Sequence, residues 1–445
     1  MGAVNVGSRL RMAVNRFLKP PEEITLRTLR RLSLRNLFLY LGPSLIVSMA
    51  YMDPGNYGTD IQGGQYFAYD LLWAVWLANL MAMILQYLSG KLGIATGKGL
   101  PEMVRHSLGK RRLTLPYWIG AEVAAAATDL AEYLGTVIAL NILFNIPLLY
   151  AAIFGAFDVI ILLVLARERF RIIEYFFMVL VSVIGIGFLY ETLLIQPSFS
   201  SIAYHSVVVS VSSQTILYVV GIVGATVMPH ALFVHSSLTK DKLATLTKGT
   251  IEDKRQHRRL HLREVILTLT IASLVNVAIL VSAATVLYPN YHLVGENVDV
   301  NHYVLILQPL YGALAAVVFA VTLLASGLAS STTGTLAGQA IMDGLLGTHV
   351  NKTLRRLVTR VINVFPTTIA ILIGLNPFSL LVYSQVVLSL MIPLPMIPLI
   401  LYTKNKALMG EFTNRKVTTL LSIVAAVVIL ALNVFLIIAT IQQGL

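Results

Sequence analysis

The chain has 445 residues, of which 57% are hydrophobic and only 12% carry a charge. Soluble proteins have about 25% charged residues, so this composition indicates a polytopic membrane protein rather than a soluble enzyme. The sequence has no cysteine, which excludes a disulfide framework and a thiolate metal site. The net charge of +12 does not predict a nucleic-acid partner, because basic residues of membrane proteins collect in cytoplasmic loops.

Long apolar segments follow one another along the chain after residue 36. A membrane-spanning helix needs about 20 apolar residues, and by this measure the sequence predicts about eleven spans. The expected spans are 37–65, 70–93, 115–143, 147–166, 171–193, 213–238, 264–287, 303–344, 356–375, 377–402 and 418–441. The first 36 residues contain no apolar run and are expected to form a cytoplasmic tail. The predicted fold class is therefore an all-α polytopic membrane protein.

The first span is interrupted at Asp53-Pro54-Gly55-Asn56. Pro54 lacks an N–H and Gly55 favours non-helical dihedral angles, so the helix must break here. A broken helix within the membrane is tolerated only where it is buried in protein or lines a polar cavity. Asp53 brings a carboxylate into this break, and an ionisable group there predicts a site for an ion or substrate. The alternative is a proline kink with a buried, neutral aspartate.

Polar side chains also interrupt the second and third spans. In the third span, Glu122, Asp129 and Glu132 are separated by 7 and 3 residues, so they lie near one helical face. Acids in an apolar span predict a proton or ion path, and the alternative is a set of salt-bridge partners buried between helices. Asn79 and Gln86 lie on one face of the second span, where they either line that path or hold helices together.

The sixth span contains a second break, at Met228-Pro229-His230, where the proline again prevents a regular helix. The imidazole of His230 can exchange protons near neutral pH, and a hydrogen-bonded core histidine and a direct metal ligand are the alternatives. The two breaks lie five spans apart, and a repeat with an odd number of spans must insert with inverted topology. Interrupted helices at corresponding positions of two such halves indicate a transporter with its substrate site near the midplane.

The later spans add further polar features. Residues 326–334, near the end of the eighth span, are rich in small and hydroxyl side chains. This composition predicts close helix packing, with a second ion site as the alternative. Arg360 lies at the start of the ninth span and could pair with an acid of the third. Gln385 lies in the middle of the tenth span and could complete a metal shell in one conformation.

The 33 Lys and Arg residues all fall on one side of the membrane under this assignment. Because basic residues collect on the cytoplasmic side, the N-terminus is expected in the cytoplasm and the C-terminus outside the cell. The basic run 254–259 is then expected in a cytoplasmic loop near anionic membrane lipid. The expected organisation is a tail (1–36), a transport core (37–402, with repeats at about 37–193 and 213–402), and a loop with a peripheral eleventh helix (403–445).

The two breaks together supply a mixed set of metal ligands. Asp53 and Asn56 provide carboxylate and amide oxygens, Met228 provides a thioether, and unwound carbonyls such as that of Ala225 add further oxygens. Magnesium and calcium prefer all-oxygen sites, whereas a thioether favours transition metals. We therefore expect a site for a divalent transition metal, with ordinary packing as the alternative for Met228.

The motifs at 53–56 and 228–230 resemble the paired signatures of the NRAMP family of proton-coupled divalent-metal transporters. Further matching stretches are 51–62, 79–99, 127–144, 330–343 and 384–390. The resemblance implies a LeuT-like fold with inverted 5+5 repeats and a multi-pass location in the plasma membrane. It also implies import of manganese or ferrous iron with protons, with no enzymatic activity and no permanently bound cofactor.

The resemblance further implies roles for individual residues. Metal ligands are expected at Asp53, Asn56, Ala225, Met228 and Gln385. The proton pathway is expected at His230, Glu132, Asp129, Glu122 and Arg360. One alternative function is a sodium-coupled amino-acid symporter of the same architecture, which Asp53 disfavours because a substrate carboxylate would meet an acid there. The other is a magnesium-transporting relative, a branch that lacks the methionine.

Overall fold

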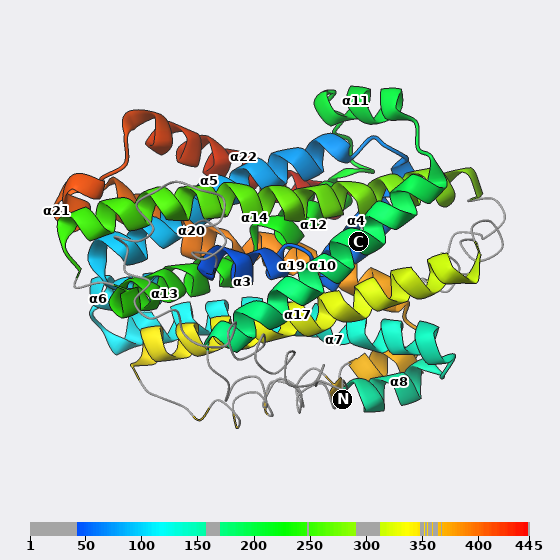
Figure 1. Cartoon of the computed structure of the whole chain (residues 1–445), viewed down its shortest axis with the longest axis horizontal. Helices are drawn as coiled ribbons and strands as arrows, with labels where there is room; N and C mark the ends of the chain where they lie inside the picture. Colours follow the sequence, from blue (N-terminus) through cyan, green and yellow to red (C-terminus); the bar gives the residue numbers. More distant parts are fainter. Residues whose placement is uncertain are drawn as a thin grey trace, which may run out of the picture.

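The computed structural model describes residues 42–156, 170–246, 249–290, 312–347 and 367–443, together with positions 351, 354, 358, 364 and 365. Every regular element in these ranges is helical, and the long helices run side by side in a bundle (Figure 1). Eight helical segments of the described part are long and apolar enough to cross a membrane. The all-α, multi-pass class predicted from the composition is confirmed.

The first half of the bundle contains short helices at the break and long helices on either side of it. Its elements are α3 (Pro43–Ala50), α4 (Pro54–Phe67), α5 (Leu72–Thr96), α6 (Leu100–Leu108), α7 (Arg111–Phe144), α8 (Leu148–Gly155) and α10 (Phe170–Ile195).

The second half begins with a short helix, which joins it to the first half. Its elements are α11 (Phe199–Val207), α12 (Ile216–Val227), α13 (Pro229–Leu246), α14 (Ile251–Val286), η2 (Tyr288–Asn290), α17 (Ala313–Leu346), α19 (Pro377–Met391), α20 (Pro393–Lys404), α21 (Lys406–Met409), η3 (Gly410–Phe412) and α22 (Lys416–Gln443).

Both predicted breaks are present. The first span is divided between α3 and α4, and the sixth between α12 and α13. In each case the second helix begins with the proline, which fits the first turn of a helix because its missing N–H has no partner there. Two pairs of half-helices therefore meet inside the bundle, as the two prolines predict.

Two of the expected spans differ clearly from the structure, and a third is described only in part. The seventh span, expected at 264–287, begins at Ile251, so the basic run expected in a loop is helical. Thr250 and Asp253 form a capping box that starts this helix in polar sequence, before the apolar segment begins. The tenth span is divided at Ile392 because Pro393 begins a new helix. Of the ninth span, expected at 356–375, the structure describes positions 358, 364, 365 and 367–375.

The broken helices are the most deeply buried elements. Ten of the residues of α12 and the residues of α4 from Pro54 to Gln65 are buried. By contrast, α22 exposes apolar side chains along its length, including Val417, Leu421 and Val434. An exposed apolar face is expected where a helix contacts lipid, so α22 lies at the periphery and the two breaks lie at the centre.

Candidate functional site

Asp53 lies at the first break, where it caps the N-terminus of α4. Its Oδ1 accepts hydrogen bonds from the backbone N–H of Asn56 at 2.9 Å and from Asn56 Nδ2 at 2.8 Å. The side chain is fully buried, and its Oδ2 has no hydrogen-bond partner among the described residues. Buried polar atoms almost always have a partner, so this oxygen is available to a ligand.

The side chain of Asn56 connects the first break to the second. Its Nδ2 also donates to the carbonyl oxygen of Ala225 at 3.2 Å. Its Oδ1 accepts from Asn276 Nδ2 at 3.1 Å and from Thr226 Oγ1 at 3.4 Å. The structure thus brings three predicted ligands, Asp53, Asn56 and the Ala225 carbonyl, into one hydrogen-bonded group.

Met228 forms the second break. Its φ of 45° lies in the left-handed region, which residues other than glycine seldom adopt. Its N–H bonds to the carbonyl oxygen of Gly224 at 3.3 Å, and its side chain is completely buried. Such strained conformations persist only where surrounding structure enforces them, and they cluster at functional sites.

Gln385 on α19 lies against both breaks. A Cβ added at Gly55 would lie 2.0 Å from Gln385 Nε2, and one added at Gly224 would lie 1.9 Å from the Gln385 carbonyl oxygen. Its Nε2 donates to Ser384 Oγ at 3.1 Å, while its Oε1 has no partner among the described residues. Gln385 therefore offers a second buried oxygen beside the Asp53 carboxylate.

The composition of this site limits what it can bind. Within the described ranges, no group of three His, Cys, Asp or Glu side chains could hold a metal ion. A cation between the breaks would therefore depend on one carboxylate, on amide and carbonyl oxygens, and on the Met228 thioether. A site with a single charged ligand holds a divalent ion less tightly than a cage of several carboxylates, which suits release.

His230 begins α13 next to the second break and contacts α7. Its Nδ1 lies 3.0 Å from Thr128 Oγ1, and the ring is completely buried. Thr128 directly precedes Asp129, which is 3% exposed. The structure thus places His230 beside the acidic segment of α7.

The other three residues predicted for that pathway differ in how much the structure shows of them. Glu132 is buried where α7 packs on α17, and a Cβ at Gly334 would lie 2.8 Å from its Oε1. Glu122 is half-buried, two helical turns before Asp129. Arg360 lies outside the described residues. Of the residues predicted for this pathway, the structure places Asp129, Glu132 and His230 in the interior, and their role in proton movement stays a prediction.

The two amides of α5 differ in their surroundings. Gln86 Oε1 lies 2.7 Å from His235 Nδ1, so this residue connects α5 to α13. This contact agrees with the predicted role of holding helices together. Asn79 is 5% exposed, and its Oδ1 has no hydrogen-bond partner among the described residues.

Several residues that support the site were not predicted from the sequence. Asn276 Nδ2 donates to the carbonyl oxygen of Tyr51 at 3.0 Å as well as to Asn56, so it holds the unwound segment in place. Ser326 Oγ donates to the carbonyl oxygen of Met52. The sequence feature that could have indicated the role of Asn276 is its amide side chain within an apolar span. Two hydroxyls of the hydroxyl-rich segment of α17, those of Ser326 and Thr333, bond to backbone carbonyls of the first span, in agreement with the predicted role in helix packing.

Glu264 was also missed, and it caps the other end of the first span. Its Oε1 accepts from the backbone N–H of Gly42 at 2.6 Å and of Ser44 at 3.1 Å. Ser44 Oγ lies 3.2 Å from His235 Nε2. These contacts attach the first turn of α3 to α13 and α14. An acid at the start of the seventh predicted span was the available signal.

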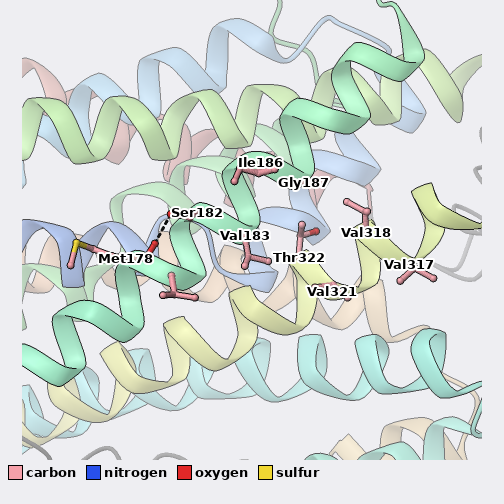
Figure 2. A pocket seen from close by; sticks show the side chains of 10 residues that line it. Met178, Ser182, Val183, Ile186, Gly187, Val317, Val318, Val321 and Thr322 are labelled. Carbon is pink, nitrogen blue, oxygen red and sulfur yellow. Dashed lines mark hydrogen bonds between the residues drawn. The ribbon is translucent and has the colours of Figure 1, made fainter. Parts of the chain in front are cut away.

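A pocket of about 600 Å³ lies between α10 and α17, and none of its lining residues belongs to either break (Figure 2). Ser182 and Thr322 are its only hydroxyl-bearing lining residues, and Ser182 Oγ donates to the carbonyl oxygen of Met178 at 2.8 Å. Val179, Ile186 and Val317 are exposed apolar residues of its wall. An apolar groove on the outside of a membrane bundle suits lipid chains rather than a cation, so this pocket is not the candidate site.

The comparison with solved structures identifies the architecture. A manganese transporter of Eremococcus coleocola, solved with an aromatic bis-isothiourea compound, matches with a TM-score of 0.80 and 32% identity. The match covers 92% of this chain and 87% of that one. Mhp1, a nucleobase-cation-symport-1 transporter, matches with a TM-score of 0.53 and 13% identity over 90% of this chain and 93% of its own, which shows a shared fold alone.

The sequence comparisons agree. The divalent metal cation transporter MntH of Granulibacter bethesdensis is 42% identical over 403 residues, or 90% of this chain and 88% of that protein. MntH of Deinococcus radiodurans is 41% identical over 406 residues, or 90% of each chain. The model of the family described as natural resistance-associated macrophage protein-like matches residues 44–439. This chain therefore belongs to the Nramp family of membrane transporters.

Proposed function

We propose that this protein imports divalent transition-metal ions, including manganese and ferrous iron, together with protons by alternating access. In this proposal, the metal enters from outside the cell and binds between the two helix breaks. The N-terminus lies in the cytoplasm and the C-terminus outside, in line with the distribution of basic residues. The relatives named as divalent metal cation transporters and the manganese transporter structure support the substrate class.

The observation that carries this proposal is the buried Oδ2 of Asp53, which has no hydrogen-bond partner among the residues that the structure describes. A carboxylate that has lost its water is stable as an anion only beside a positive charge. Asn56 and the Ala225 carbonyl lie in hydrogen-bond contact around it, and Gln385 Oε1 is also without a partner in the described part. A divalent cation would satisfy both orphan oxygens at once.

The thioether of Met228 makes transition metals the favoured substrates. A soft sulfur ligand contributes little to magnesium or calcium, which bind hard oxygen ligands. It contributes more to manganese, iron and the later transition metals. The strained backbone of Met228 is consistent with this role, because ordinary packing does not require a methionine at a left-handed position.

Release toward the cytoplasm requires α3 to move away from the helices that hold it. The Glu264 cap, the contact between Ser44 and His235, and the hydrogen bond from Thr333 Oγ1 to the Ile46 carbonyl at 3.0 Å keep α3 in place. Breaking these contacts would open a route from Asp53 to one end of the bundle. A half-helix that pivots at the break is a common way to expose a midplane site.

Proton movement is proposed to run from the metal site through His230 to the acids of α7. His230 is two residues from Met228 and contacts Thr128, next to Asp129. Glu132 continues the acidic face by one turn and is buried. Polar contacts of this kind are costly in a membrane interior unless they carry ions or protons.

The test is transport by purified protein in liposomes, with a panel of divalent ions outside and a pH indicator inside. Manganese and ferrous iron should enter saturably and acidify the interior, whereas calcium and magnesium should enter far more slowly. Uptake of labelled amino acids with sodium, in place of metal uptake, would contradict the proposed substrate. Metal uptake with unchanged internal pH would contradict the coupling to protons.

Replacing Met228 with alanine should weaken selectivity more than it weakens total transport. Loss of the sulfur removes a ligand that only transition metals use well, so we expect the manganese-to-calcium uptake ratio to fall about tenfold or more. Uptake of both ions in liposomes measures this ratio. Met396, a fully buried methionine of α20, is the matched control for lost packing. An equal ratio in M228A and M396A would make Met228 a packing residue.

A further inference from the structure

A second pocket, of about 420 Å³, lies at one end of the bundle, and none of its lining residues belongs to either break. It forms between the first turns of α14 and the segment that joins α21 to α22. Its lining residues are Arg255, Arg258, Arg259, Glu411, Thr413 and Arg415. Four arginines and one acid give this pocket a strong positive charge, and none of its residues takes part in the proposed transport site.

One of the four arginines is neutralised within the pocket. Arg255 binds Glu411 through two hydrogen bonds, Nε to Oε1 at 3.0 Å and Nη2 to Oε2 at 2.7 Å. The guanidinium lowers the pKa of the Glu411 carboxyl, so the pair stays ionised at neutral pH. The Glu411 carboxylate is therefore already paired with Arg255.

The other three arginines retain their charge. Arg258, Arg259 and Arg415 have no carboxylate partner in the described part of the chain. The guanidinium of Arg258 lies over the ring of the buried Phe412, 5.6 Å from its centroid, and this contact holds the side chain in place beside the pocket. Arg258 also interacts with the Glu411 carboxylate at longer range. Glu411 cannot balance all four arginines, so the guanidinium groups around this concavity repel each other unless an anion binds between them.

The position of the pocket relative to the bilayer indicates where that anion comes from. The 36 residues of α14 extend about 54 Å, well beyond the roughly 30 Å hydrocarbon core, so its first turns lie outside that core. After Ile251 at its start, α14 has its next exposed large apolar residue at Leu262, one turn after Arg258, and Arg415 directly precedes α22, whose exposed apolar face starts at Val417. Arg258 and Arg415 are therefore each about one turn from surface that faces lipid.

We propose that this pocket binds the phosphate group of an anionic membrane lipid. Arginine pairs with phosphate through two parallel N–H···O bonds, and three such side chains can surround one phosphate. The acyl chains of the lipid would lie along the exposed apolar face of α22. A bound phosphate would link Arg258 and Arg259 of α14 to Arg415 at the start of α22, and so attach the peripheral helix to the core.

Native mass spectrometry of the full-length protein in detergent tests this proposal. The protein is titrated with dioleoylphosphatidylglycerol, and separately with dioleoylphosphatidylcholine, whose headgroup carries no net charge. We expect preferential binding of phosphatidylglycerol. The double variant R259Q/R415Q should weaken that binding about thirtyfold, because each near-surface charge contributes about a factor of five. R259K/R415K keeps the charge but loses the paired N–H geometry, so its affinity for phosphatidylglycerol should lie between those of the wild type and R259Q/R415Q.

The matched control is R111Q/R112Q, which removes two exposed arginines from the start of α7. This variant should retain wild-type affinity to within about twofold, since neither arginine lines the pocket. An equal loss of affinity in the control would show that only the total charge matters, and would overturn the proposed site. Full competition by an equal concentration of inorganic phosphate would overturn the lipid as its ligand, in favour of a soluble phosphate.

Discussion

Replacing Asp53 with alanine should abolish metal uptake. Asp53 is the only carboxylate in the hydrogen-bonded group that joins the two breaks, and its Oδ2 has no other partner in the described part. Without it, a divalent cation would meet only neutral ligands in a buried site, where an uncompensated charge is very costly. We expect the initial rate of manganese uptake in liposomes to fall by more than about a hundredfold. This is a larger loss than the roughly 10–100-fold that follows when a residue that only hydrogen-bonds to a metal ligand is removed.

Asp70 provides the control for this experiment. It is also an aspartate of the first half, but its side chain is 45% exposed and pairs with His205 at 3.1 Å, away from the breaks. D70A should therefore transport manganese at close to the wild-type rate. D53N, which keeps the shape and the capping acceptor but loses the charge, should be as inactive as D53A. Near-normal uptake by D53N would show that Asp53 serves only as a helix cap.

Replacing Gly224 with alanine should disrupt the contact between α12 and α19 and with it the second break. The added Cβ would lie 1.9 Å from the Gln385 carbonyl oxygen and 2.8 Å from the Ser389 nitrogen, and both are backbone atoms that cannot rotate away. The helices must then separate at the point where Gln385 reaches the site. We expect a loss of unfolding free energy of about 1–3 kcal/mol, as for other overpacked interiors, and at least a tenfold loss of uptake.

Gly185 on α10 is the matched control, because a Cβ there would meet no atom within 4 Å. G185A should be at least as stable as the wild type, since alanine favours a helix over glycine by about 1 kcal/mol. Thermal unfolding in detergent and uptake in liposomes report the two effects separately. If G224A and G185A behave alike in both assays, the close approach of α12 and α19 is not needed for the site.

The breaks could be predicted from the sequence because their causes are local. A proline removes a donor and blocks the preceding turn wherever the chain places it, so Pro54 and Pro229 mark the second half-helices in the structure. The polar start of α14 could not be placed by the same reasoning. Hydropathy identifies the part of a helix inside the bilayer, and it does not reveal that Lys254 to Arg259 continue the same helix into water.

The position of the candidate ligands at the breaks was predictable for a similar reason, whereas the residues that support them were not. Asp53, Asn56 and Met228 lie at the breaks themselves. Asn276 holds Asn56 across 220 residues of sequence, and Glu264 caps α3 across 222. Such contacts depend on which helix faces which, and a single sequence contains no direct signal for that pairing. Arg360, predicted as a partner of the acids in α7, stays a prediction because it lies outside the described residues.

The most direct test of the central claim is anomalous diffraction from crystals of the protein grown with manganese. A bound manganese ion should give its strongest anomalous peak between the two breaks, within coordination distance of Asp53 Oδ2 and Met228 Sδ, and the same peak should vanish in D53A crystals. A strongest peak elsewhere in the bundle, or an undiminished peak in D53A, would contradict the assignment of the metal to this site.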